Sequence, residues 1–506
     1  MNKFKIKTFA FYLILILSAT ALFLVACKSK SSGDYYPDGG FYYGVDTGAG
    51  GNEYKEIDEN PVTLVSAYPI SRFSMDCNTA AYSNIRRAIT DGRQIVKNQV
   101  RIEEMINYFH YDYDEPDEGK PLSCSGWISP CPWNTEANLL TVGLKAKEVE
   151  FGVVQNNLVF LLDVSGSMGS ADKIELMQAA FCILSENLKD EDTVSIVTYA
   201  GASKTLLDGE KGADRLKIQR AIEDLTAGGS TAGAQGIQKA YELAEKHFIP
   251  GGNNRVILAT DGDFNVGISS ETELKNFISE KRGMGVSLSI LGFGYGNLKD
   301  NKMQTLAAAG GDSNYFYIDS LLEARRVLAD EIGGTLITVA KDVKAQVEFN
   351  PAHVYSYRLL GYENKLLSQA EWEDETKDAG DIGSGHCVTA VYEIVLNEDP
   401  LAVSSMGGNY LQISVKYNDP ETNAPQAALI KYLDGTDVKL IMPNDDVEFI
   451  SCVVEAALVM RDSIHKGAAS LASVISRLQG IAGLSADPYK SEFLALMQKL
   501  KTSGWY

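Results

Sequence analysis

The sequence predicts a mixed α/β protein: a doubly wound, mostly parallel sheet that is inserted in or followed by a β-sandwich-like domain, with a helical segment at the C-terminus. Between residues 155 and 336, short apolar strands alternate with helical patterns, as in a parallel sheet with helices on both faces. Between 340 and 440, strands follow one another with turn residues between them, as in a sandwich. Over 446–506 the apolar residues recur at helical spacing.

Near the N-terminus, three lysines precede a mostly apolar run from Phe9 to Val25, and the run ends in Leu-Val-Ala before Cys27. This pattern over residues 1–26 resembles a bacterial lipoprotein signal peptide. The resemblance implies that Cys27 is lipidated and becomes the first mature residue, and several acyl chains at one residue anchor a protein stably in a lipid bilayer. An uncleaved membrane anchor is the alternative, because the apolar run is nearly long enough to span.

The residue after the cysteine bears on location. Lys28 stands where an Asp causes inner-membrane retention in some bacteria. We therefore expect a lipid-anchored protein of the bacterial cell envelope, at the outer membrane or cell surface rather than the inner membrane. Residues 27–60 are rich in Gly, Tyr, Asp and Ser, which predicts a flexible tether.

Residues 61–150 are predicted to form an N-terminal flanking domain with short amphipathic helices and a strand at 139–146. If that strand joins the later sandwich, the parallel-sheet domain is an insertion in it. Glu103 and Glu104 are adjacent on one predicted helix, and adjacent helical positions do not face each other. We expect both carboxylates to be solvated.

The central domain carries the chemistry. Strands are expected near 158–163, 193–199, 254–260, 286–292 and 314–318. Folds of this class bind ligands outside the carboxyl ends of their strands. Asp163 and Asp261 both stand at such ends.

The first of these strands runs into Asp163-Val-Ser165-Gly-Ser167. Hard cations such as Mg²⁺ prefer oxygen ligands, and a carboxylate with two hydroxyls supplies part of such a shell. Further oxygens are available at Thr231, which opens a predicted helix, and at Asp261. Taken alone, Asp-x-Ser-x-Ser is also compatible with an ordinary strand-to-helix turn in which a serine caps the helix.

The five positions together, in this order and spacing, resemble the von Willebrand factor type A (VWA) domain, a Rossmann-like fold. The resemblance implies a metal-ion-dependent adhesion site that holds Mg²⁺ or Mn²⁺. By that resemblance Ser165, Ser167 and Thr231 contact the metal, and Asp163 and Asp261 act directly or through water. One coordination position stays open for an Asp or Glu carboxylate of a protein partner.

Four segments outside the central domain stand out: Phe-Ser-Met-Asp at 73–76, Arg-Ile-Glu-Glu-Met-Ile-Asn-Tyr-Phe at 101–109, Leu-Gly-Tyr-Glu-Asn at 360–364 and Gly-Ser-Gly-His at 383–386. They resemble a bacterial family of VWA lipoproteins whose flanking domains have no known function. The resemblance covers nearly the whole mature chain.

The charge of the chain and its motifs argue against nucleic acids and nucleotides as partners. The formal net charge of −21 argues against a nucleic-acid partner, whose phosphates need a basic surface. There is no phosphate-binding P-loop, and the glycines at 292, 294 and 296 lack dinucleotide spacing, so no nucleotide is expected.

The predicted function is divalent-metal-dependent protein binding or adhesion at the bacterial envelope, without enzymatic activity. Two alternatives remain open at this point. The same metal could activate water in a hydrolase of envelope material. The chain could also be an assembly or chaperone-coupling factor, since some VWA proteins work beside ATPases.

Overall fold

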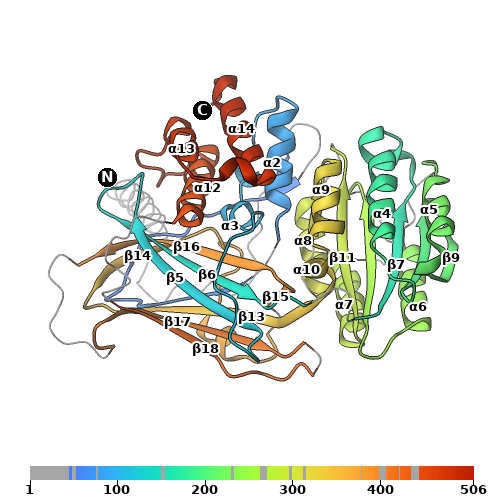
Figure 1. Cartoon of the computed structure of the whole chain (residues 1–506), viewed down its shortest axis with the longest axis horizontal. Helices are drawn as coiled ribbons and strands as arrows, with labels where there is room; N and C mark the ends of the chain where they lie inside the picture. The colour runs from blue at the N-terminus through green and yellow to red at the C-terminus, as the bar shows by residue number, and fades with distance from the viewer. Residues whose placement is uncertain are drawn as a thin grey trace, which may run out of the picture. The chain divides into compact units, whose positions relative to one another are not determined.

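The computed structural model describes residues 45–47, 53–75, 78–149, 154–229, 233–262, 270–295, 299–311, 315–377, 379–397, 406–420, 422–434 and 444–506. These all belong to one compact unit, Tyr43–Tyr506 (Figure 1). The predicted signal peptide, its Cys27 and the predicted metal ligand Thr231 lie outside the described residues. Within the described ranges, no helix is both long enough and apolar enough to cross a membrane.

The central domain is built on a six-stranded sheet with the order β12-β11-β10-β7-β8-β9. Its strands are β7 (Asn156–Asp163), β8 (Thr193–Tyr199), β9 (Ser203–Lys211), β10 (Asn253–Thr260), β11 (Val286–Phe293) and β12 (Tyr315–Ile318). All neighbours are parallel except β9, which runs antiparallel to β8. The five predicted strands are present. The edge strand β9 was missed because its sequence is mostly polar and lacks a continuous apolar run.

Helices cover both faces of this sheet, so the doubly wound prediction is confirmed (Figure 1). Alternate residues of β7 point to opposite faces: Phe160 lies in the core beneath α4, and Leu161 lies in the core beneath α6. One face carries α4 (Leu176–Glu186), α5 (Arg215–Glu223) and α9 (Leu321–Arg325), which continues through a π-helical turn, Arg326–Asp330, into α10 (Ile332–Leu336). The other carries α6 (Gly233–Lys246), α7 (Glu271–Gly283) and α8 (Asp300–Ala309).

Two antiparallel sheets form the sandwich, and residues from both sheets share one apolar core. The first contains β15 (Gly380–Gly383), β13 (Thr338–Phe349), β17 (Asn409–Asn418) and β18 (Leu429–Asp434), with β4 (Ile70–Ser74) paired to β13. The second contains β3 (Thr63–Leu64), β14 (Val354–Leu360), β16 (Cys387–Leu396), β6 (Asn138–Ala146) and β5 (Leu122–Pro130). Because β3 to β6 precede the parallel sheet and the other strands follow it, the central domain is an insertion in the sandwich.

The C-terminal segment is helical, as predicted, and consists of α12 (Asp445–Arg461), α13 (Leu471–Leu478) and α14 (Pro488–Ser503). It shares an apolar core with α2 (Ala80–Thr90) and α3 (Ile102–Ile106), which come from the other end of the described chain (Figure 1). Phe109 makes an edge contact with Phe449, with ring centroids 4.8 Å apart. Helix α12 is buried along almost its whole length, because it lies between α3 and the other C-terminal helices.

One local expectation was wrong. Glu103 and Glu104 are both buried, at 3% exposure. The Glu104 carboxylate accepts a hydrogen bond from the Arg101 guanidinium at 2.5 Å, and Arg101 also bonds Asp300 of α8 at 2.8 Å. These partners come from tertiary packing, which the spacing of acidic residues does not reveal.

The predicted tether over 27–60 lies mostly outside the described residues, which include only 45–47 and 53–60 of it. Within it, β1 (Val45–Thr47) pairs with β2 (Glu53–Lys55), and Tyr54 is 2% exposed.

Candidate metal site

Asp163 and Asp261 meet at one edge of the parallel sheet. Asp163 is the last residue of β7, and Asp261 directly follows β10. The two strands are parallel neighbours, so their carboxyl ends lie side by side. Both residues are buried, at 0% and 1% exposure. A pair of buried carboxylates this close is unfavourable without a compensating cation or hydrogen bonds.

Three hydrogen bonds hold the Asp163 carboxylate. The backbone N–H of Ser165 donates to Oδ1 at 2.9 Å, while the hydroxyls of Tyr199 and Thr260 donate to Oδ2 at 3.1 and 3.3 Å. Burial raises the pKa of Asp163, the hydrogen bonds from Ser165 oppose that rise, and the charge of Asp261 adds to it. The carboxylate is thus held in one orientation by the neighbouring strands β8 and β10.

Ser165 and Ser167 bring two hydroxyls together above this carboxylate. The loop between them turns in a short 3₁₀ helix, Gly166–Met168, and the two Oγ atoms lie 3.0 Å apart. In an octahedron with metal–oxygen bonds of about 2.1 Å, neighbouring ligand oxygens are about 3.0 Å apart. The spacing therefore suits two adjacent ligands of Mg²⁺ or Mn²⁺. It equally allows a hydrogen bond between the hydroxyls.

A second loop closes on this one through backbone hydrogen bonds. The N–H of Gly228 donates to the carbonyl of Val164 at 2.8 Å, and the N–H of Gly166 donates to the carbonyl of Gly229 at 3.0 Å. The structure thus places Gly228 and Gly229 at the serine loop. Thr231 follows them in the chain, outside the described residues, and its role as a ligand stays a prediction.

Lys173 is a charged residue of the site that sequence reasoning missed. Its ammonium donates to Oδ2 of Asp261 and to the backbone carbonyl of Ser167, both at 2.9 Å. The lysine stands six residues after Ser167, at the start of the helix that follows the serine loop. A lysine there would ordinarily be placed on a solvated helix face, so only the fold reveals its contact with Asp261.

The donor set fits a hard divalent cation, because two carboxylates and two hydroxyls offer only oxygen. Over the part of the chain that the structure describes, no three His, Cys, Asp or Glu side chains gather as a metal cluster. The site differs from such clusters because hydroxyls stand in place of further carboxylates. Asp163, Ser165, Ser167 and Asp261 would hold the metal, and the hydroxyls, being neutral, would leave much of its charge available.

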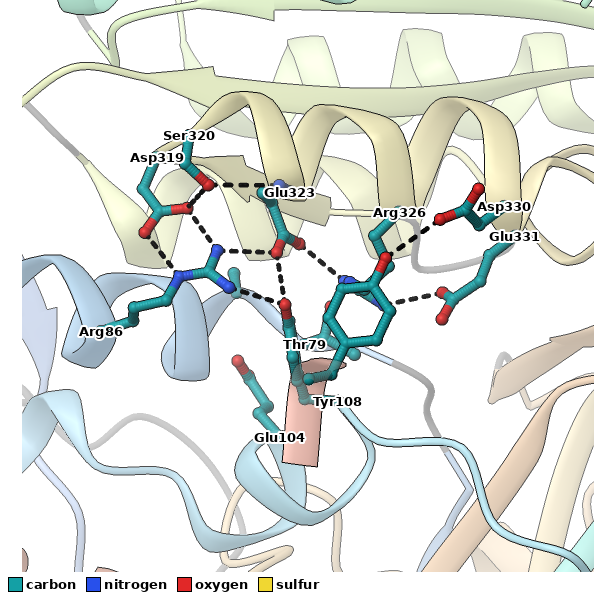
Figure 2. Close-up of polar contacts among 12 residues, drawn as sticks. Thr79, Arg86, Glu104, Tyr108, Asp319, Ser320, Glu323, Arg326, Asp330 and Glu331 are labelled. Atoms are coloured by element: carbon teal, nitrogen blue, oxygen red, sulfur yellow. Dashed lines mark hydrogen bonds and ion pairs between the residues drawn. The ribbon is translucent and has the colours of Figure 1, made fainter. Parts of the chain in front are cut away.

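The N-terminal flank is joined to the central domain by a buried ion network. Figure 2 shows Arg86 of α2 reaching Asp319 and Glu323, and Glu323 is shared with Arg326. The Arg86–Glu323 and Arg326–Glu323 pairs measure 2.8 and 2.7 Å. Tyr108 receives a hydrogen bond from Arg86 and donates one to Glu323. The charged side chains of this network are at most 5% exposed, so the network fixes α2 against α9.

The same helix reaches the metal loop. Arg87 of α2 pairs with Asp172 at 2.5 Å, and it donates a hydrogen bond to the Tyr317 hydroxyl at 2.9 Å. Asp172 directly precedes Lys173 in the chain. The flanking domain therefore contacts the segment that supplies the ammonium of the site.

A separate cavity of about 390 Å³ lies between α10 and the sandwich, lined in part by Lys145, Arg326, His386 and Cys387. Burial lowers the pKa of His386 to about 4 and raises the pKa of the Cys387 thiol to about 11. At neutral pH the thiol is therefore protonated, and a protonated thiol is a poor nucleophile. This cavity does not offer an activated cysteine.

The fold agrees with comparisons to known protein families. The von Willebrand factor type A domain matches residues 157–329, a domain described as von Willebrand factor matches 49–141, and the C-terminal domain of the uncharacterized protein YfbK matches 334–502. VWA domains commonly bind a divalent metal at a metal-ion-dependent adhesion site. The VWA domain is a binding module, which supports the prediction that the chain is not an enzyme.

Relatives extend these matches over most of the chain. The uncharacterized protein YfbK of Escherichia coli (strain K12) is 36% identical over 466 residues, which covers 88% of this chain and 80% of that protein. Inter-alpha-trypsin inhibitor heavy chain H3 of Bos taurus is 31% identical over 177 residues, 33% of this chain and 20% of that one. A solved von Willebrand factor type A structure from Catenulispora acidiphila covers 78% of this chain and 89% of its own, at 14% identity and a TM-score of 0.41. The chain therefore belongs to the family of the uncharacterized protein YfbK, a family of VWA-domain proteins.

Proposed function

We propose that this chain is a lipid-anchored binding protein of the bacterial cell envelope that captures a protein partner through a bound divalent cation. The observation that supports the proposal is the meeting of Asp163, Ser165, Ser167 and Asp261 at one edge of the parallel sheet. Thr231 is the further ligand that we expect. Neither a structural turn nor a helix cap requires a second buried carboxylate at this edge.

The cation that suits the site is Mg²⁺ or Mn²⁺. All donors are hard oxygens, and the 3.0 Å spacing of the serine hydroxyls matches adjacent vertices of a small octahedral shell. Asp163 already accepts three hydrogen bonds. These favour contact between its carboxylate and the metal through a bound water molecule.

A partner carboxylate would complete the shell. The serine hydroxyls are neutral, so they do not offset the charge of the metal, and an Asp or Glu side chain on a partner would gain a strong electrostatic contact. Such a contact needs the metal, which makes binding sensitive to chelators. The flanking sandwich and helices would then present the VWA domain to that partner.

The direct test is metal-dependent capture from an envelope extract. The full chain, immobilised in mild detergent, is exposed to extract with Mg²⁺ or with EDTA, beside the Asp163→Ala variant. We expect a set of proteins that is retained with Mg²⁺, released by EDTA and absent with the variant. Asp224→Ala, at an exposed position after α5, is the matched control and should behave like the wild type. Equal retention in EDTA, or by Asp163→Ala, would contradict the proposal.

The anchor needs its own test, because it depends on Cys27 alone. Cells that express the chain are grown with a labelled fatty acid and then fractionated. We expect the label on the wild-type protein in the membrane fraction, and we expect Cys27→Ala to lose both label and membrane association. An unlabelled protein that stays in the membrane would point instead to an uncleaved N-terminal span.

A further inference from the structure

We propose that Lys173 acts as a built-in cation of the metal site, which weakens metal binding and makes the metal-loaded site a stronger receptor for an anionic group. The inference rests on the proposed function. It adds that the metal-loaded site selects a negatively charged group on the partner. It predicts opposite effects of one substitution on the two binding steps.

The contact with the site is direct. The Lys173 ammonium lies 2.9 Å from Oδ2 of Asp261, and their side chains are 10% and 0% exposed. The same ammonium donates to the carbonyl of Ser167 at 2.9 Å. One positive charge is thus attached to both halves of the site, the serine loop and the end of β10.

The surrounding structure keeps this charge in place. The stem of Lys173 passes against Gly294, where a Cβ atom would lie only 2.3 Å from its Cε, and Gly294 has a φ of +70° that favours glycine. Asp172, the residue before the lysine, is paired with Arg87 of the flanking helix at 2.5 Å. The backbone and the stem are therefore both held, and the ammonium has little room to leave.

The formal charges show what the lysine does. The carboxylates of Asp163 and Asp261 carry two negative charges and Lys173 carries one positive charge, so these side chains sum to −1. A divalent cation brings the site to +1. If the lysine were neutral, the same site would start at −2 and end at zero.

The two binding steps respond with opposite sign, because Coulomb energies at short range in a partly buried site are large. A less negative site attracts the metal less strongly. A loaded site that keeps a net positive charge attracts a carboxylate more strongly. The neighbouring Asp172 does not cancel this charge, because Arg87 already pairs with it.

The test uses the full chain in mild detergent, with Mn²⁺ as the metal and acetate as the anionic probe. Mn²⁺ binding is measured by calorimetry. Acetate binding to the Mn²⁺-loaded protein is monitored as a decrease in the relaxation rate of the water protons. In Lys173→Met we expect the Mn²⁺ dissociation constant to fall by about tenfold and that of acetate to rise by about threefold or more. Lys173→Gln also removes the charge and should shift both dissociation constants in the same directions. It serves as the test variant if Lys173→Met folds poorly.

Two controls separate charge from structure. Lys173→Arg keeps the charge and should remain near the wild type in both titrations. Lys466→Met removes an exposed lysine that pairs with Asp462, and it should change neither constant. Lys173 variants that bind Mn²⁺ and acetate like the wild type, while Asp163→Ala loses Mn²⁺, would overturn this inference alone. Absence of Mn²⁺ binding in every variant and in the wild type would overturn the proposed function and this inference with it.

Discussion

The phenol of Tyr199, at the end of β8, donates a hydrogen bond to Asp163 at the end of the neighbouring strand β7, with 3.1 Å between the oxygens. Tyr199 is fully buried, and burial together with the charge of Asp163 raises its pKa well above the usual value. The phenol is therefore a permanent donor at physiological pH. It bonds Oδ2 of the carboxylate, whereas the Ser165 amide bonds Oδ1.

We expect Tyr199→Phe to weaken metal binding while leaving the fold intact. Residues that hydrogen-bond a metal ligand orient it, and their loss typically weakens metal affinity by about tenfold or more. The ring still fills the core, so we expect the melting temperature of the metal-free protein to change little. Calorimetry with Mn²⁺ checks the first effect and circular dichroism the second. An unchanged Mn²⁺ affinity would mean that Thr260 and Ser165 are sufficient to orient Asp163.

We expect Arg86→Met to destabilise the protein. Arg86 is 3% exposed and pairs with Asp319 and Glu323, so its removal leaves buried carboxylates with fewer partners (Figure 2). Breaking such a buried pair costs about 3–5 kcal/mol. The readout is the urea concentration at the midpoint of unfolding.

The matched control for that change is Arg325→Met. Arg325 pairs with Asp330 at 3.6 Å, but its side chain is 70% exposed. Surface ion pairs contribute about 0–1 kcal/mol, so this variant should unfold close to the wild type. Equal midpoints for the two variants would show that the buried network contributes little to the attachment of α2.

Glu103 should make stability depend on pH. Burial raises its pKa to about 7, with the charges of Glu363 and Glu104 adding to the rise, and one of its oxygens has no hydrogen-bond partner. Since the pKa is raised on folding, this group stabilises the folded state fully below its unfolded value of about 4.5 and loses that contribution as the pH rises through about 7. The neutral amide of Glu103→Gln removes this dependence.

We therefore expect Glu103→Gln to raise the melting temperature at pH 8 and to have little effect at pH 5. The free energy of unfolding at pH 8 should rise by about 1–3 kcal/mol. Glu118→Gln, at an exposed position, should change neither value. A variant that loses stability at both pH values would show that Glu103 is needed in its charged form.

Local patterns were sufficient to predict most of the central domain. The apolar strand β7 ends in Asp163 and β10 leads directly into Asp261. Parallel strands place their carboxyl ends at one edge, so the two carboxylates could be paired from sequence alone. The sequence left two arrangements open, a central domain inserted in the sandwich or followed by it. The pairing of β6 with β16 and of β4 with β13 decides for the insertion. Short or polar strands such as β9 and β15 carry too few apolar residues to be recognised.

Partnerships that depend on tertiary packing could not be predicted. Lys173 and Tyr199 touch the predicted ligands, yet neither belongs to the motif that identified the site. Glu104 was expected in solvent because it is adjacent to Glu103 on one helix. Its partner Arg101 is buried and also pairs with Asp300, far along the chain, and the sequence does not reveal these contacts. Thr231 lies outside the described residues, so its place in the site stays a prediction.

The central claim is that Asp163 belongs to a divalent-metal site. Calorimetric titration of the full chain with Mg²⁺ and with Mn²⁺, beside Asp163→Ala, tests it most directly. We predict a single-site isotherm for the wild type with both ions and no binding by the variant, whose melting temperature without metal should remain close to that of the wild type. Absence of binding by the wild type, or equal binding by Asp163→Ala, would contradict the account.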